Sequence, residues 1–240
     1  SLGMDMLSFV ETEFSPKSIA AIGINSKVAL LYKLIGFKTK TMNQWFLPNR
    51  NIVEPELLVG DLPEHQNGML NSSDLIIDCG IEREVEVQQF LSKHCARRSF
   101  DYIVKRYLKH PTYKYKVYAF KKNKSDIYAV VVGRKVTGGG ANAFRLTEMF
   151  CDFNSSSDLG GALCELMDRN GFEYIDFLEY GYDPHSLIEI GFMKCSDRLF
   201  VPHLFEPFVA VHSEVKIAFK SEQPFICTKG DSDLDRPNLG

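Results

Sequence analysis

The chain has 240 residues, which is enough for one large domain or two small ones. Hydrophobic residues make up 45% of it and charged residues 25%, an ordinary globular balance. The net charge of −3 excludes a general attraction to nucleic acid or anionic lipid, and no stretch approaches the roughly 18 apolar residues of a membrane span. We therefore expect a cytoplasmic protein with no nucleic-acid partner and no membrane span.

The first quarter of the sequence alternates between helical and strand patterns. In chain order, it predicts a helix over 4–14, a buried strand over 18–24, a helix over 26–35 and a strand over 37–47. Ser15-Pro16 ends the first helix, Asn25 or Ser26 is placed to cap the second, and Gly36 ends it.

The remaining sequence predicts a mixed α and β region. Residues 49–80 are less regular, and later residues alternate with a period of two, which is typical of an antiparallel meander. The expected strands are 57–59, 75–77, 113–120, 126–136, 144–153, 174–180, 200–209 and 215–226, and the expected helices are 82–92, 97–109, 158–170 and 184–190.

Four features occur twice in the same order and at nearly equal spacing, which indicates an internal repeat. A helix opens the unit, a strand follows, a glycine-containing tetrad ends the strand, and a short helix closes with Gly-Phe. The matching segments are Ser1-Leu2-Gly3 with Asp158-Leu159-Gly160, Ile22–Asn25 with Tyr180–Asp183, and Gly36-Phe37 with Gly191-Phe192.

The run from Asn25 through Ala29, Leu31-Tyr32 and Gly36-Phe37 resembles the "N…A…LY…LGF" signature of GNAT acyltransferases. Ser1-Leu2-Gly3 resembles the end of their "Q/R-x-x-G-x-G/A" loop, with serine in place of the first glycine. Residues 97–228 resemble a related GNAT-like domain of proteins associated with bacterial surface-polysaccharide synthesis. The segments that carry this second resemblance are 109–118, 174–177, 191–192, 205–208 and 230–238.

The resemblance implies an α+β fold, a GNAT-like mixed sheet flanked by helices, in which the second copy is complete and the first is partial. The implied domains are 1–60 (the C-terminal half of a GNAT-like domain), 61–96 (a connection), 97–228 (a second GNAT-like domain) and 229–240 (a tail). The first copy lacks the strands that should precede its helix, so a partner chain, as in a homo-oligomer, or a further segment would have to complete it.

The resemblance also implies acetyl-CoA, or another acyl-CoA, as co-substrate and a small amine as acceptor. A glycine turn at a helix N-terminus presents backbone N–H groups to a pyrophosphate. The residues expected to bind the cofactor are Ser1, Leu2, Gly3 and Asn25 in the first copy and Gly160 and Gly161 in the second. Simple helix capping is the alternative for Gly160 and Gly161, because a lone Gly-Gly is a weak motif.

Three side chains are candidates for acid and base. Tyr32 matches the family tyrosine that protonates or orients the leaving thiol; packing alone is the alternative. Glu148 and Asp152 belong to the strand that borders the acyl cleft, so they are candidates for the base, unless they are solvated strand carboxylates. Further candidates, each expected to be an ordinary polar residue, are His110, His185, His203 and Glu206.

No metal site is expected. The six cysteines are widely spaced and form no C-x-x-C pair. The alternating Asp231, Asp233 and Asp235 lack the glycine and distal glutamate of a calcium loop.

Two functions therefore stay open. One is a GNAT-like N-acyltransferase that acetylates an amine, such as an amino sugar in surface-polysaccharide synthesis. The other is a non-catalytic GNAT-like module that binds a ligand or partner, which the altered loop at 155–161 favours.

Overall fold

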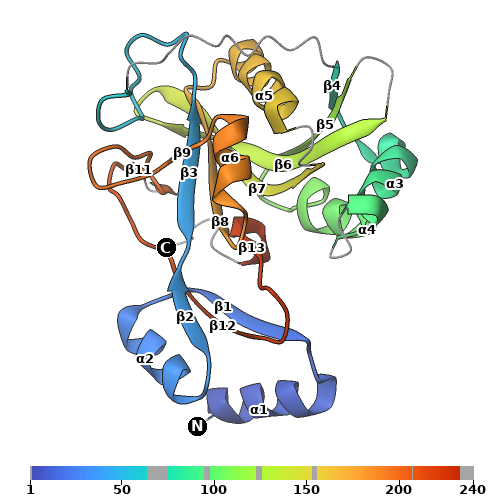
Figure 1. Cartoon of the computed structure of the whole chain (residues 1–240), viewed down its shortest axis with the longest axis vertical. Helices are drawn as coiled ribbons and strands as arrows, with labels where there is room; N and C mark the ends of the chain where they lie inside the picture. The colour runs from blue at the N-terminus through green and yellow to red at the C-terminus, as the bar shows by residue number, and fades with distance from the viewer. Residues whose placement is uncertain are drawn as a thin grey trace.

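The computed structural model describes residues 2–63, 75–94, 98–122, 126–152, 156–206 and 208–232. They form two units, one above the other in Figure 1: a large unit around an eight-stranded sheet and a small unit, the N-terminal unit, around a three-stranded sheet. Within these ranges, no helix has both the length and the apolar character needed to cross a lipid bilayer.

The large sheet is mixed, because only its β7–β8 pair is parallel. Its strands, in spatial order, are β4 (Leu75–Asp78), β5 (Tyr115–Lys121), β6 (Ile127–Gly138), β7 (Ala141–Cys151), β8 (Tyr174–Tyr180), β3 (Asn43–Pro48) and β9 (Met193–Lys194). The short strand β13 (Cys227–Thr228) also pairs with β8. The antiparallel meander β5–β7 confirms the period-two pattern of the sequence, and β4 pairs with its outer strand, β5.

Helices cover both faces of the large sheet. On one face lie α5 (Ser156–Asn170) and α6 (Pro184–Ile190), and on the other lie α3 (Glu84–His94) and α4 (Phe100–Ile103). The alternation of β6 explains this, since Val131 packs with the α5 side whereas Val130 and Val132 pack with the α3 side. Strong apolar alternation thus produces a three-layer α/β/α core.

The N-terminal unit has its helices on one side of its sheet. The sheet order is β1 (Ser18–Ile24), β12 (Lys216–Ser221) and β2 (Lys38–Thr41), all antiparallel. The helices are α1 (Leu2–Phe14) and α2 (Ser26–Leu34). The other face, which carries Ile217 and Phe219 of β12, packs on Leu178 and Tyr180 of β8.

The two units exchange strands. The sequence predicts one strand over 37–47, but only Met42 separates β2, in the small sheet, from β3, in the large one. Likewise, the predicted strand 215–226 becomes β12 in the small sheet, after which the chain returns to the large sheet as β13. The order helix–strand–helix–strand occurs twice, as α1–β1–α2–β2 and as α5–β8–α6–β9. In each copy, a strand from the other end of the chain lies between the two strands: β12 between β1 and β2, and β3 between β8 and β9 (Figure 1).

Three predicted elements are shorter or less regular than expected. Residues 57–59 make only one β-bridge, from Val59 to Phe200, and residues 200–209 form only the two-residue strands β10 (Leu204–Phe205) and β11 (Phe208–Val209). The helix predicted over 97–109 is α4 continued by a π-helical turn, Val104–Leu108. Short 3₁₀ turns lie at Ile81–Arg83 and Lys229–Asp231.

The exchange predicts that the two units unfold together. Phe219→Ala in β12 removes a buried ring from the face that joins the units, so it should lower the free energy of unfolding by about 3 kcal/mol. Trp45 in β3, the single tryptophan, should report this loss in urea titrations, together with far-UV circular dichroism. Phe14→Ala, at an exposed position of the same unit, is the matched control and should change stability by less than about 0.5 kcal/mol. A fluorescence transition that Phe219→Ala leaves unchanged would show that the units unfold independently.

Candidate functional site

Strands β7 and β8 form a fork. They pair in parallel only between Phe144–Leu146 and Ile175–Phe177. The β6–β7 register shifts between Leu146 and Glu148, so Thr147 is the extra residue of a bulge. Because a bulge bends its strand, β7 leaves β8 beyond this point. We call the opening, between residues 147–151 and 178–180, the fork.

Glu148 lies at the base of the fork and is completely buried. Its Oε1 accepts hydrogen bonds from Arg98 Nε at 3.0 Å and from the Tyr107 hydroxyl at 2.8 Å, and its Oε2 accepts one from Thr228 Oγ1 at 3.3 Å. Arg98 also pairs with Asp231. Burial raises the pKa of Glu148, and Arg98 offsets part of that rise.

The C-terminal segment, residues 227–232, fills the fork. Strand β13 pairs antiparallel with β8, Cys227 opposite Tyr180 and Thr228 opposite Glu179. The following 3₁₀ turn has a capping box in which Asp231 accepts the backbone N–H of Thr228 at 2.9 Å. The segment is therefore folded into the large unit.

In the N-terminal unit, no inserted segment covers the outer edge of β1 among the described residues. Strand β1 pairs on one side only, with β12. At its C-terminal end, Asn25 caps α2 by accepting the backbone N–H of Val28 at 2.9 Å. The outer edge of β1 is therefore unpaired, whereas the corresponding edge of β8 in the large unit is paired with β13.

No protein-family model matches the sequence, and no curated protein matches it. Solved structures do match. A GCN5-related N-acetyltransferase from Anabaena variabilis superposes with a TM-score of 0.54 at 7% identity, over 91% of this chain and 49% of that one. The chain has a GNAT-type acyltransferase fold.

Two further structures agree with this GNAT fold. A functionally unknown conserved protein from Staphylococcus epidermidis gives a TM-score of 0.51 at 7% identity, over 92% of this chain and 79% of that one. A conserved protein of unknown function from Enterococcus faecalis, labelled a probable N-acyltransferase, gives 0.51 at 9% identity, over 92% and 48%. The chain thus spans about half the length of the Anabaena and Enterococcus proteins.

The glycines expected to bind pyrophosphate in the large unit do not form a turn. Helix α5 begins at Ser156, so Gly160 and Gly161 lie inside it and both are buried. Backbone N–H groups this far into a helix donate to the carbonyls four residues earlier and are not available to an anion. The physical reason for the difference is that Ser156 and Ser157 already belong to the helix. Asp152 follows the last residue of β7, and its backbone N–H pairs with Tyr128 O at 2.9 Å.

The site residues predicted in the N-terminal unit lie on its two helices and at the N-cap of α2. Gly3 is in the first turn of α1, where backbone N–H groups have no partner within the helix. Tyr32 is half-buried on α2, and its ring packs edge-on against Phe37 with centroids 4.9 Å apart. Ser1 lies outside the described residues, and of Leu2 only the helical backbone is described. The structure thus places Tyr32 and Gly3 in one unit and Glu148 and Asp152 in the other.

Of the other base candidates, His110 and Glu206 accept hydrogen bonds from neighbouring groups. His110 Nδ1 accepts the backbone N–H groups of Thr112 and Tyr113, at 3.2 and 2.9 Å. Glu206 accepts the Tyr113 hydroxyl at 2.6 Å. Burial, with Lys229 and Arg145 nearby, lowers the pKa of His203 to about 2, so its imidazole is neutral. His185 is exposed beside Glu189. Across the described ranges, no three His, Cys, Asp or Glu side chains gather as metal ligands would.

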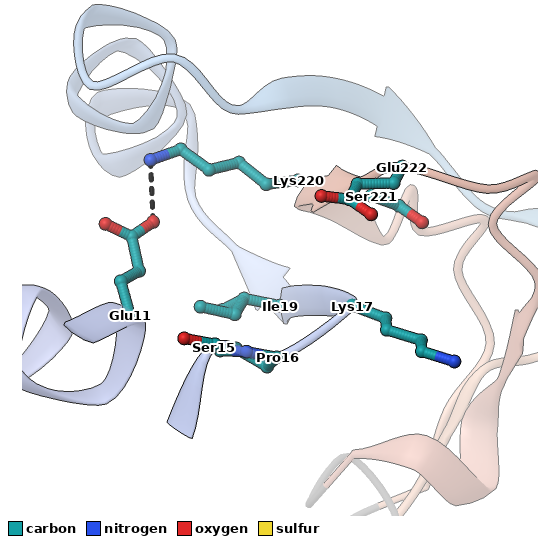
Figure 2. Close-up of a pocket in the computed structure, with 8 residues that line it drawn as sticks. All are labelled: Glu11, Ser15, Pro16, Lys17, Ile19, Lys220, Ser221 and Glu222. Carbon is teal, nitrogen blue, oxygen red and sulfur yellow. Dashed lines mark hydrogen bonds and ion pairs between the residues drawn. The ribbon is translucent and has the colours of Figure 1, made fainter. Parts of the chain in front are cut away.

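Two grooves lie on the N-terminal unit. One, of about 430 Å³, runs between the end of α1 and the edge of the sheet, where Glu11 and Lys220 pair at 2.7 Å (Figure 2). The other, of about 220 Å³, has three lysines around it, Lys33, Lys40 and Lys216. Residues 14–53 contain five lysines and one arginine but no acidic residue, so this region is basic although the whole chain is acidic.

Sequence reasoning missed the residues that surround Glu148. Arg98 and Tyr107 come from the segment that includes α4, and Thr228 and Asp231 come from the C-terminal segment. No local pattern marks them, since they meet only through tertiary contacts. The one signal in the sequence is the alternating aspartate run, whose first member, Asp231, pairs with Arg98.

The buried network predicts a large cost for removing the charge of Glu148. Glu148→Gln would leave the Arg98 guanidinium buried with a weaker partner, so the free energy of unfolding should fall by about 3 kcal/mol. Asp101→Asn is the control, because Asp101 and Lys105 form an exposed pair at 2.7 Å, and its loss should cost less than about 1 kcal/mol. Urea denaturation measures both; equal, small effects would contradict a structural role for Glu148.

Proposed function

We propose that this chain is part of an acyl-CoA-dependent N-acyltransferase built from two GNAT-like domains, and that its acyl-CoA site belongs to the N-terminal unit. The GNAT-type fold supports the reaction class. The observation that carries the location is the contrast between the open edge of β1 and the filled fork of the large unit. We further propose acetyl-CoA as donor and a small amine, such as an amino sugar of surface polysaccharides, as acceptor, in the cytoplasm.

Charge supports this location. Acyl-CoA carries phosphate groups, and a basic surface raises the local concentration of an anionic substrate. The region 14–53 has only basic charges, and Gly3 lies where the first turn of α1 exposes backbone N–H donors. Tyr32 is the acid of the proposal, because a thiolate that leaves a thioester needs a proton. The two base candidates, Glu148 and Asp152, lie in the large unit. We therefore propose that the base that deprotonates the amine comes from outside the N-terminal unit.

The N-terminal unit exposes an apolar face that its counterpart buries. When the α1 and α5 sequences are aligned with Leu2 opposite Leu159, Met6, Phe9 and Val10 correspond to Leu163, Leu166 and Met167. Met6, Phe9 and Val10 are 61%, 59% and 37% exposed, whereas Leu163, Leu166 and Met167 are 0%, 2% and 1% exposed. In the large unit, strands β5–β7 supply most of the sheet side chains that cover this face of α5.

We propose that an antiparallel meander equivalent to β5–β7 covers this face of α1 and pairs with the free edge of β1. It would complete the acyl-CoA cleft beside Tyr32. A second copy of the chain, the homo-oligomer expected from the sequence, is the less suitable source, because its own meander is packed between α5 and α3. The meander would therefore be a segment outside these 240 residues.

The alternative is a non-catalytic GNAT-like module. The buried, fully engaged Glu148 and the helical Gly160 and Gly161 favour it for the large unit. They do not bear on the N-terminal unit, which contains Tyr32 and Gly3 and in which β1 has an open edge.

Acetyl-CoA titrated calorimetrically into the natural full-length polypeptide tests the function. We expect saturable binding and amine-dependent release of coenzyme A. Tyr32→Phe should lower kcat about 100-fold and leave the affinity for acetyl-CoA unchanged, because the hydroxyl acts on the leaving thiolate. Tyr113→Phe, which removes a hydroxyl far along the chain in the large unit, should keep full activity. The absence of both binding heat and a thermal shift at millimolar acetyl-CoA would overturn the proposal.

A pair of substitutions tests the meander. In the 240-residue chain, Leu166→Ala should cost about 3 kcal/mol, and Phe9→Ala should stay within about 0.5 kcal/mol because its ring is exposed. When the meander is present, Phe9→Ala should also cost about 3 kcal/mol. Glu13→Ala, on the exposed side of α1, should be neutral in both contexts. If Phe9→Ala still changes the free energy of unfolding by less than about 0.5 kcal/mol in the longer protein, the meander does not cover this face of α1.

A further inference from the structure

The fork of the large unit is the place where a GNAT-type fold would receive an extended ligand. Two strands that diverge leave backbone N–H and C=O groups unpaired, and an extended chain can pair with them as an added strand. In this protein the added strand is part of the molecule itself. Cys227 and Thr228 pair with Tyr180 and Glu179, on the same edge of β8 that pairs with β7 lower down.

The C-terminal segment also contacts the β7 side of the fork. At Gly230 the backbone approaches β7 so closely that an added Cβ would lie 2.9 Å from both Thr147 O and Glu148 Oε1 and would collide with the Tyr107 hydroxyl. Farther along β7, the Tyr182 hydroxyl donates to Met149 O at 2.7 Å. Both walls of the fork are therefore occupied.

Charged groups hold the segment from outside the fork. Arg98 links Glu148 of β7 with Asp231 of the segment, and Arg106 Nη2 donates to Ser232 O at 2.7 Å. Lys229 is only 2% exposed. Withdrawing the segment would separate Arg98 from Asp231 and leave the buried Glu148 without its hydrogen bond from Thr228. Loss of a hydrogen-bond partner from a buried carboxylate is unfavourable.

We propose that residues 227–232 are a built-in occupant of this fork, in the place of acyl-CoA, so that the large unit does not bind acyl-CoA. The residues present do not fit the cofactor: the backbone edge of β8 is paired, Gly230 packs on Thr147, and Gly160 and Gly161 are helical. The large unit then serves as the support onto which the N-terminal unit is tied by β3 and β12. This inference is independent of whether the N-terminal unit is active.

Hydrogen–deuterium exchange with mass spectrometry tests it on the intact protein. Peptides covering 225–232 should exchange as slowly as peptides of β8, and 1 mM acetyl-CoA or coenzyme A should not change their exchange. Binding confined to the N-terminal unit would slow exchange only in residues 2–41 and 216–221. No change anywhere would contradict the proposed acyltransferase function but would agree with a permanently filled fork. Fast exchange at 225–232, or exchange there that acetyl-CoA accelerates, would overturn the inference.

A glycine pair gives a second test that needs no ligand. Gly230→Ala should speed exchange across 227–232 and lower the melting temperature, since the segment must shift away from Thr147 and Tyr107. Gly3→Ala is the matched control, because its added Cβ meets nothing within 4 Å, and it should leave exchange at 227–232 unchanged. If Gly230→Ala leaves both exchange and melting unchanged, the segment does not occupy the fork in solution.

Discussion

The structure depends on the backbone of one strand, β8, which must find hydrogen-bond partners on both edges because it runs through the core. Strand β3 pairs along one edge, from Tyr174 to Glu179. The other edge is divided: β7 pairs with Ile175–Phe177, and β13 pairs with Glu179 and Tyr180. A buried backbone group without a partner is costly, so the three segments that satisfy β8 are held together although they are far apart in the sequence. The exchange of strands and the filling of the fork both follow from this requirement.

Two buried carboxylates mark the two edges of this arrangement. Glu179 accepts hydrogen bonds from Asn43 Nδ2 at 3.0 Å and Trp45 Nε1 at 2.8 Å, both on the imported strand β3. Glu148 accepts hydrogen bonds from Arg98, Tyr107 and Thr228, the last of them in the imported C-terminal segment. Burial raises the pKa of both carboxyls, a property that is common in catalytic residues. Here the same property accompanies satisfied hydrogen bonds to segments from elsewhere in the chain, so a raised pKa in this fold indicates anchoring as readily as catalysis.

The two units use similar secondary structure for different ends. In the large unit, α5 is buried under the meander and the fork is closed by residues 227–232. In the N-terminal unit, the corresponding helix is exposed and the edge of β1 is open. An apolar helix face and an unpaired strand edge at one place are both unfavourable in water, and one added sheet segment would relieve both. This contrast is the reason for the proposal that the N-terminal unit binds acyl-CoA and that the large unit supports it.

The sequence by itself determined the local elements and the class of fold. Period-two alternation predicted the β5–β7 meander, and the caps at Asn25 and Asp183 and the glycines at 36 and 191 set the limits of α2 and α6, because these signals act within a few residues. Only the tertiary structure decided that 38–41 and 43–48 belong to different sheets, that 227–232 enters the fork, and that Glu148 is paired rather than available. Strand partners and buried charge pairs are contacts between residues distant in sequence, and no local pattern in β2, β3 or the C-terminal segment states which edge each will find. The physical reason is that every strand edge offers the same backbone groups, so the choice among edges is made by packing and charge in the assembled core.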